Sequence, residues 1–136
     1  MEQKLANSKA KLLILCNPHN PIGKVWDKET LEKIGELCLK HNVTILSDEI
    51  HCDITYKKNK YIPMASVSDK IANIIITCVS MSKAFNLTGL QSSAIIIKNE
   101  EIKKSRKSNK HRWSSRTKYF SYTSFWSCNK IKSVTR

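Results

Sequence analysis

The chain has 136 residues, with 24 Lys or Arg against 11 Asp or Glu and a formal net charge of +13. A chain of this length holds one domain at most. No stretch approaches the roughly 20 apolar residues that a membrane-spanning helix needs, and no apolar signal-peptide region follows the first residues, so the sequence predicts no membrane segment and no secretion signal.

Hydrophobic runs and the breaks between them predict alternating strands and helices. Residues 1–5 are typical of a helix, and the apolar run 11–16 predicts a buried strand that an Asn/Pro/Gly segment ends. Asp27 is a suitable N-cap for a helix that continues to about His41. Further short strands are predicted at 43–46, 73–79 and 93–97.

The order of these elements predicts an α/β fold. Strand, helix, strand at this spacing indicates a right-handed parallel crossover, and nearly continuous apolar strands are typical of a sheet covered on both faces. We therefore expect a mostly parallel sheet with flanking helices. Ligands of such sheets bind beyond the carboxyl ends of the strands. Asn20, Asp48 and Lys83 each follow a different predicted strand, so we expect them to cluster there.

Lys83 ends the sequence SMSK, directly after the apolar run 74–79. A lysine beside small hydroxyl residues at the end of a buried strand is well placed to form a Schiff base with a carbonyl cofactor. The structural alternatives are a solvated surface lysine, a simple turn at Asn20 and a helix cap at Asp48.

Three motifs follow three predicted strands: NPHNPIG at 17–23, SDEIHCD at 47–53 and SMSKAFNLTGLQ at 80–91. In this order and at these separations they resemble the fold-type I aminotransferase superfamily, which binds pyridoxal 5'-phosphate (PLP). Within it they are similar to the MalY/PatB-like cystathionine β-lyase branch. The resemblance covers about residues 11–101, and it implies that residues 1–104 are part of a large, PLP-binding domain.

The resemblance implies a role for each matching residue. Lys83 matches the catalytic lysine, which holds PLP as a Schiff base and later removes the substrate's Cα proton. Asp48 matches the carboxylate that pairs with the pyridine nitrogen, and Asn20 matches the asparagine that hydrogen-bonds the phenolic oxygen. Ser80 matches a hydroxyl that contacts the phosphate, and Ser82 is a second candidate for that contact.

Two positions differ from the wider superfamily. His51 stands where many aminotransferases carry a tyrosine, and an imidazole can still donate a hydrogen bond to the phenolic oxygen. A purely structural histidine is the alternative at this position. Gln91 stands where an arginine often binds the phosphate. Both forms resemble the lyase branch.

The resemblance therefore implies a PLP-dependent carbon–sulfur β-lyase, which splits cystathionine or a similar cysteine conjugate into a thiol, pyruvate and ammonia. A class I/II aminotransferase is the alternative, because both reactions begin in the same way. Enzymes of this superfamily have several hundred residues and are dimers. We therefore expect a fragment of a homodimeric parent enzyme with a small amino-acid substrate, inactive by itself.

The five cysteines show no C-x-x-C spacing, and most lie in apolar runs. This pattern predicts buried free thiols rather than disulfides or a metal site. Their odd number is typical of a reducing compartment, so we expect a cytoplasmic protein.

Residues 105–136 differ in composition from the rest of the chain: they hold nine Lys or Arg, eight serines and six aromatic residues, and no Asp or Glu. No helical or strand period is evident, so we expect an irregular, disordered tail. One hypothesis takes the tail as genuine, a non-catalytic module that binds nucleic acid or an anionic membrane.

The second hypothesis takes the tail as out-of-frame translation after about Lys104. One choice of codons for residues 110–119, read from the second base, contains Glu-Pro-Asn, which resembles the lyase branch at about this distance after Lys83. We favour this second hypothesis, so nucleic acid is not an expected partner.

Overall fold

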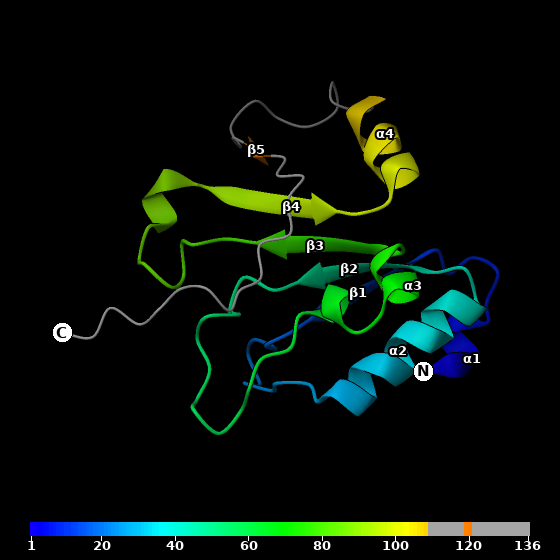
Figure 1. The fold of residues 1–136 in the computed structure, drawn as a ribbon, viewed down its shortest axis with the longest axis horizontal. Coiled ribbons are helices and arrows are strands. Elements are labelled where there is room, and N and C mark those ends of the chain that lie inside the picture. The colour runs from blue at the N-terminus through cyan, green and yellow to red at the C-terminus, as the bar shows by residue number, and fades with distance from the viewer. Residues whose placement is uncertain (109–118, 121–136) are drawn as a thin grey trace.

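The computed structural model describes residues 1–108 and 119–120 of the chain. The predicted disorder of the remaining tail residues therefore lies outside the described residues. Figure 1 shows a single sheet with helices beside it. The elements are α1 (Glu2–Leu5), β1 (Leu12–Cys16), α2 (Lys28–Lys40), β2 (Thr44–Asp48), η1 (Met64–Ser66), α3 (Asp69–Ala72), β3 (Ile75–Val79), η2 (Thr88–Leu90), β4 (Ser93–Ile97), α4 (Glu100–Ser108) and β5 (Tyr119–Phe120).

The sheet has the strand order β1-β2-β3-β4-β5, and its first three strands are parallel. The β4 strand runs antiparallel to β3, and the short β5 pairs parallel to β4. In Figure 1 the arrows of β1, β2 and β3 accordingly point the same way, and β4 points back. The predicted α/β fold with a mostly parallel sheet and flanking helices is confirmed. The sequence did not indicate the reversed direction of β4.

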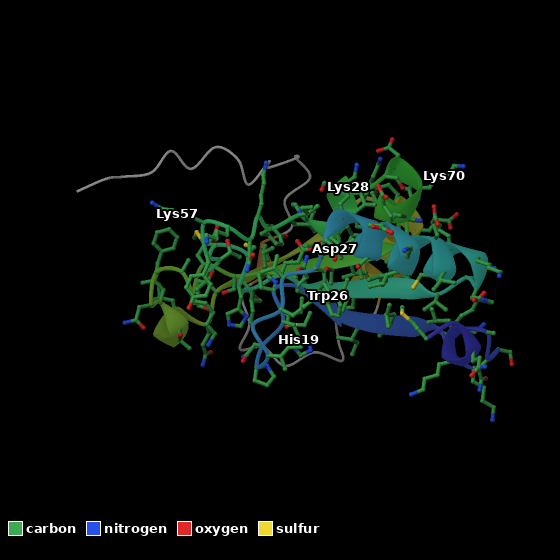
Figure 2. All side chains as sticks on the ribbon, turned by 90° about the horizontal axis from the view of Figure 1, so that it is seen from below. His19, Trp26, Asp27, Lys28, Lys57 and Lys70 are labelled. Carbon is green, nitrogen blue, oxygen red and sulfur yellow. The ribbon has the colours of Figure 1, made fainter. Side chains whose placement is uncertain are left out.

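Helix α2 begins where the sequence predicted. The Asp27 side chain caps it, because its Oδ1 accepts a hydrogen bond from the backbone N of Thr30 at 2.8 Å. Lys33 pairs with Glu29 across one turn at 2.8 Å. Figure 2 shows Trp26, Asp27 and Lys28 in succession where the chain enters α2. This crossover joins two neighbouring parallel strands, β1 and β2.

The core lies between α2 and one face of the sheet. Alternate residues of the strands point to this face, and the fully buried ones include Ile45 and Ile75, 0% and 1% exposed. They pack with residues of α2, α3 and η1 in one cluster. Its buried members are Leu5, Leu15, Leu31, Ile34, Cys38, Val43, Ile45, Met64, Ile71 and Ile75.

The other face of the sheet is open at β1, which corrects the prediction of a sheet covered on both faces. Leu12 and Ile14 point away from the core and are 51% and 69% exposed. Uninterrupted apolar strands indicated burial on both faces, but α2, α3 and η1 contribute their buried side chains to one core cluster, which includes Leu15 and not these two residues.

Gly35 lets helices α2 and α3 approach closely. A Cβ at this position would fall against the side chain of Ile71, with Cγ1 at 2.8 Å and Cγ2 at 3.0 Å. We expect Gly35→Ala to lower the free energy of unfolding by about 1–3 kcal/mol, as overpacking of a core does. Urea denaturation measures this change.

Gly89→Ala is the matched control, because nothing lies within 4 Å of a Cβ built at Gly89. Adding Ile71→Val to the Gly35→Ala chain should recover part of the loss, since it removes a methyl group from the crowded contact. Equal stability of the two alanine variants would contradict the close approach.

Among the residues described, no helix has the length and apolar character that crossing a membrane requires. Four of the cysteines are described, and no disulfide joins any two of them: Cys38 and Cys52 are buried, and Cys16 and Cys78 are half-buried. Burial raises the pKa of the Cys38 thiol to about 11, so this side chain behaves as a small apolar residue. Helix α4 crosses the predicted boundary between residues 104 and 105.

Candidate functional site

The carboxyl ends of the three parallel strands meet at one edge of the sheet. Cys16, Asp48 and Cys78 stand side by side in the register of β1, β2 and β3. The pairing continues one residue further, because the N–H of Asn17 donates to the carbonyl of Asp48 at 3.0 Å and the N–H of Glu49 donates to the carbonyl of Cys78 at 2.9 Å. The segments that carry the three sequence motifs therefore leave the sheet together.

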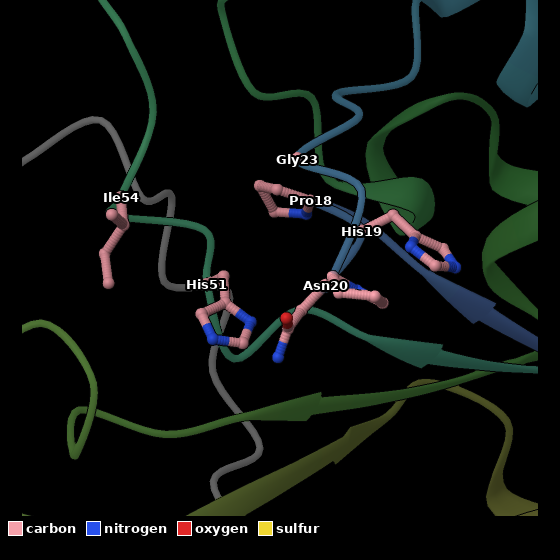
Figure 3. A pocket seen from close by; sticks show the side chains of 7 residues that line it. Pro18, His19, Asn20, Gly23, His51 and Ile54 are labelled. Atoms are coloured by element: carbon pink, nitrogen blue, oxygen red, sulfur yellow. The ribbon is translucent and has the colours of Figure 1, made fainter.

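A pocket of about 220 Å³ lies between two of these segments. One wall comes from residues 18–23, after β1, and the other comes from His51 and Ile54, after β2. Figure 3 shows the side chains of Asn20 and His51 facing the same space, whereas the ring of His19 is turned away from His51. Two of the sequence-predicted site residues thus line one pocket.

His51 lines this pocket and carries one buried ring nitrogen. Its Nδ1 is buried and has no hydrogen-bond partner within the described part of the chain. A buried polar atom without a partner costs free energy, so a ligand oxygen that accepted a hydrogen bond there would be favoured. Asn20 is exposed and offers an amide opposite the imidazole.

Asp48 is the last residue of β2 and is half-buried. Its Oδ1 accepts a hydrogen bond from the backbone N of Ile50 at 3.3 Å, which leaves further acceptor capacity on the carboxylate. This residue is adjacent to the pocket-lining segment but does not itself line the pocket.

Lys83 lies apart from this pocket, exposed in the turn that follows β3. The turn is held by Ser80, whose Oγ lies 2.7 Å from the carbonyl O of Ser92 and 2.8 Å from the Oγ of Ser82. Gln91 adopts a left-handed backbone conformation, with φ 48°. The structure therefore gathers Asn20 and His51, sets Asp48 beside them, and leaves Lys83, Ser80 and Ser82 outside the pocket.

Residues 1–125 match the family model described as aminotransferase class I and II. The chain belongs to the aminotransferase class I and II family. Among curated relatives, it is 55% identical over 97 residues to cystathionine beta-lyase PatB of Bacillus subtilis. This alignment covers 71% of this chain and 25% of that protein. It is 38% identical to human kynurenine–oxoglutarate transaminase 3 over 71% of this chain and 21% of that protein.

A solved structure of a C-S lyase is similar to this chain in fold as well as in sequence. The PLP-bound C-S lyase from Staphylococcus hominis superposes with a TM-score of 0.71 and 41% identity, over 81% of this chain and 28% of that one. The chain thus spans about a quarter of the length of these members of the family.

Two buried polar residues of this aminotransferase-family chain were not singled out from the sequence. Asn17 is fully buried and Glu49 is 2% exposed. The sequence did contain a signal for them, because each is a polar residue directly after a buried apolar strand. A polar side chain that is buried at such a position requires hydrogen-bond partners. Burial raises the pKa of the Glu49 carboxyl, against hydrogen bonds from Tyr61, Ser47 and the backbone of Met64 that lower it.

Proposed function

We propose that the chain carries the cofactor-binding segment of a PLP-dependent carbon–sulfur β-lyase. The observation that carries this proposal is the pocket at the carboxyl ends of the parallel strands, which Asn20 and His51 line. The 55% identity to a cystathionine β-lyase and the likeness to a PLP-bound C-S lyase support the same chemistry.

The residues present fit one edge of PLP. The phenolic oxygen of the cofactor is a hydrogen-bond acceptor. His51 Nδ1 is buried and has no partner among the described residues, so it can donate a hydrogen bond to this oxygen. Asn20 supplies an amide on the facing wall. Asp48, the last residue of β2, has a carboxylate oxygen that can still accept a hydrogen bond from a protonated pyridine nitrogen.

In this proposal Lys83 holds PLP through its ε-amine, and Ser80 and Ser82 contact the phosphate. Both hydroxyls hydrogen-bond within the turn after β3, so phosphate contact requires them to exchange these partners. When bound, PLP supplies an electron sink that stabilises negative charge at the substrate's Cα. Lys83 would accept the Cα proton only after the substrate's own amine has released its ε-amine, and Asp48 would keep the pyridine nitrogen protonated.

An aminotransferase is the second candidate, which the 38% identity to a kynurenine–oxoglutarate transaminase favours. The two functions differ in their products. A lyase releases ammonia, pyruvate and a thiol from cystathionine, whereas an aminotransferase needs a 2-oxo acid acceptor and releases no ammonia. We expect the isolated chain to give little of either reaction, because the stacking residue, most phosphate donors and the carboxylate-binding arginine that the resemblance implies lie outside it.

The complete enzyme, in this proposal, acts on a small amino-acid substrate as a cytoplasmic homodimer. The chain spans about a quarter of its relatives' length, so these properties belong to the whole protein. The odd number of cysteines in the sequence, with no disulfide among the four that the structure describes, supports a reducing compartment.

Covalent trapping tests the role of Lys83. The chain is incubated with PLP, reduced with borohydride, digested and analysed by mass spectrometry. We expect the label to be at least about tenfold enriched at Lys83 over the exposed Lys57 and Lys28, since a positioned cofactor raises the local concentration of its carbonyl.

The Lys83→Ala chain is the blank for this experiment, and Lys57→Ala is the matched control. Label distributed evenly over the lysines, unchanged by Lys83→Ala, would contradict the assignment of Lys83 as the attachment point.

For residues 105–136, we propose a shift of reading frame near Lys104. The absence of Asp and Glu from this segment supports it, although the family match extends to residue 125. Sequencing the coding DNA across this point tests the proposal: an uninterrupted frame, shared by independent isolates, would favour a genuine basic tail instead.

A further inference from the structure

The pocket lies between two loops that have no regular secondary structure of their own. The first loop, residues 17–26, connects β1 to α2 and carries Asn20, and the second loop, residues 49–63, connects β2 to η1 and carries His51. The separation of these two side chains therefore depends on what fixes the loops to each other.

Asn17 closes the first loop and ties it to the second. Its side chain is fully buried, its Oδ1 accepts from the backbone N of Trp26 at 3.2 Å, and its Nδ2 donates to the carbonyl of Ile62 at 3.1 Å. The indole Nε1 of Trp26 also donates to the carbonyl of Cys16 at 3.0 Å. One amide thus joins both ends of the first loop and the far end of the second.

Glu49 closes the second loop in the same manner. Its Oε1 accepts from the Oγ of Ser47 at 2.7 Å and from the backbone N of Met64 at 3.1 Å, and its Oε2 is hydrogen-bonded to the hydroxyl of Tyr61. Its own carbonyl accepts from the N–H of Cys52 at 3.0 Å, in the turn that contains His51. The carboxyl group joins the start of the second loop to its end.

We propose that Asn17 and Glu49 are positioning residues that together set the separation of Asn20 and His51 across the pocket. Neither side chain lines the pocket, so both act through the loops that they fasten. The effect on PLP binding rests on the proposed function, whereas the fixing of the loops does not.

Amide hydrogen exchange, followed by mass spectrometry, tests this proposal on the chain. We expect Asn17→Ala and Glu49→Ala to speed exchange in peptides from the two loops by about tenfold or more. Each variant removes buried hydrogen bonds, and their loss should raise the equilibrium constant for opening of the loops by at least about tenfold. Glu49→Gln should leave exchange near that of the unmodified chain, since an amide can accept from Ser47 and Met64 and donate to Tyr61.

Leu31→Ala is the matched control, because Leu31 is fully buried in α2, belongs to the core cluster and takes no part in the hydrogen bonds of Asn17 and Glu49. We expect it to speed exchange in the helix and strands without preference for the loops. The same uniform pattern in Asn17→Ala would overturn the proposal. Tyr61→Phe, which removes one hydroxyl, provides a milder variant whose effect should be confined to residues 49–63.

The dissociation constant for PLP is the second measurement, and we expect it to rise about tenfold in Asn17→Ala with Glu49→Gln unchanged. If the unmodified chain does not bind PLP, the proposed function fails while the exchange result still decides the role of the pair. If the chain binds PLP and the loops of Asn17→Ala stay protected, the positioning role alone is wrong.

Discussion

Replacing Glu49 by alanine is expected to lower the free energy of unfolding by on the order of 3 kcal/mol, because it leaves buried donors without partners and opens a cavity. The donors that lose their acceptor are the Ser47 hydroxyl, the Met64 N–H and the Tyr61 hydroxyl. Glu49→Gln, which has the same shape and keeps these bonds, should stay within about 1 kcal/mol of the unmodified chain. Urea denaturation at neutral pH measures both.

The same residue should give stability a characteristic dependence on pH. Burial raises the pKa of Glu49 in the folded chain, and the neighbouring charge of Asp48 adds to this, so the folded state binds the proton more tightly than the unfolded state. This contribution to stability is therefore complete below the ordinary pKa of a glutamate and is lost as the pH rises through the raised pKa. Glu49→Gln should remove this decline, and an unchanged pH profile would show that Glu49 is not its source.

The two faces of the sheet should respond very differently to the same substitution. Ile45→Ala, on the covered face, is expected to cost about 2–5 kcal/mol, because it leaves a cavity in the core cluster. Ile14→Ala, on the open face of the neighbouring strand, should change stability by no more than about 0.5 kcal/mol, as substitutions at exposed positions do. Thermal or urea unfolding of the two variants, compared side by side, measures the difference.

A similar loss in both variants would contradict the open face, and would indicate that Ile14 is covered by another part of the chain. The pair is well matched, because both residues are isoleucines within the neighbouring parallel strands β1 and β2.

Local signals were sufficient for most of the fold. The apolar runs gave the strands, and the Asp27 cap gave the start of α2, because capping and apolar periodicity depend on residues a few positions apart. The direction of β4 and the exposure of Leu12 and Ile14 were not predictable in this way. Both depend on which elements pack together over long separations, and an apolar run is the same whether or not a second layer covers it.

The candidate site divides in the same manner. Asn20 and His51 share a pocket because the ends of neighbouring parallel strands meet, which strand order alone predicts. The position of Lys83 relative to them stays a prediction, since its turn lies beyond the last parallel strand and outside the pocket. Asn17 and Glu49 were missed because each has a partner distant in the sequence, Ile62 for Asn17 and Met64 for Glu49, that is a backbone group, which no side-chain motif identifies.

The place of β1 has a consequence for how the protein fails on heating. Among the strands that the structure describes it lies at one edge of the sheet, and its Leu12 and Ile14 are exposed. When a molecule unfolds in part, its strands can pair with such an edge on another molecule faster than it refolds. The aggregated molecules are then lost from the folding equilibrium. The survival of the folded chain at high temperature is then set by a rate: its half-life should shorten as protein concentration rises, and the apparent melting temperature should depend on scan speed.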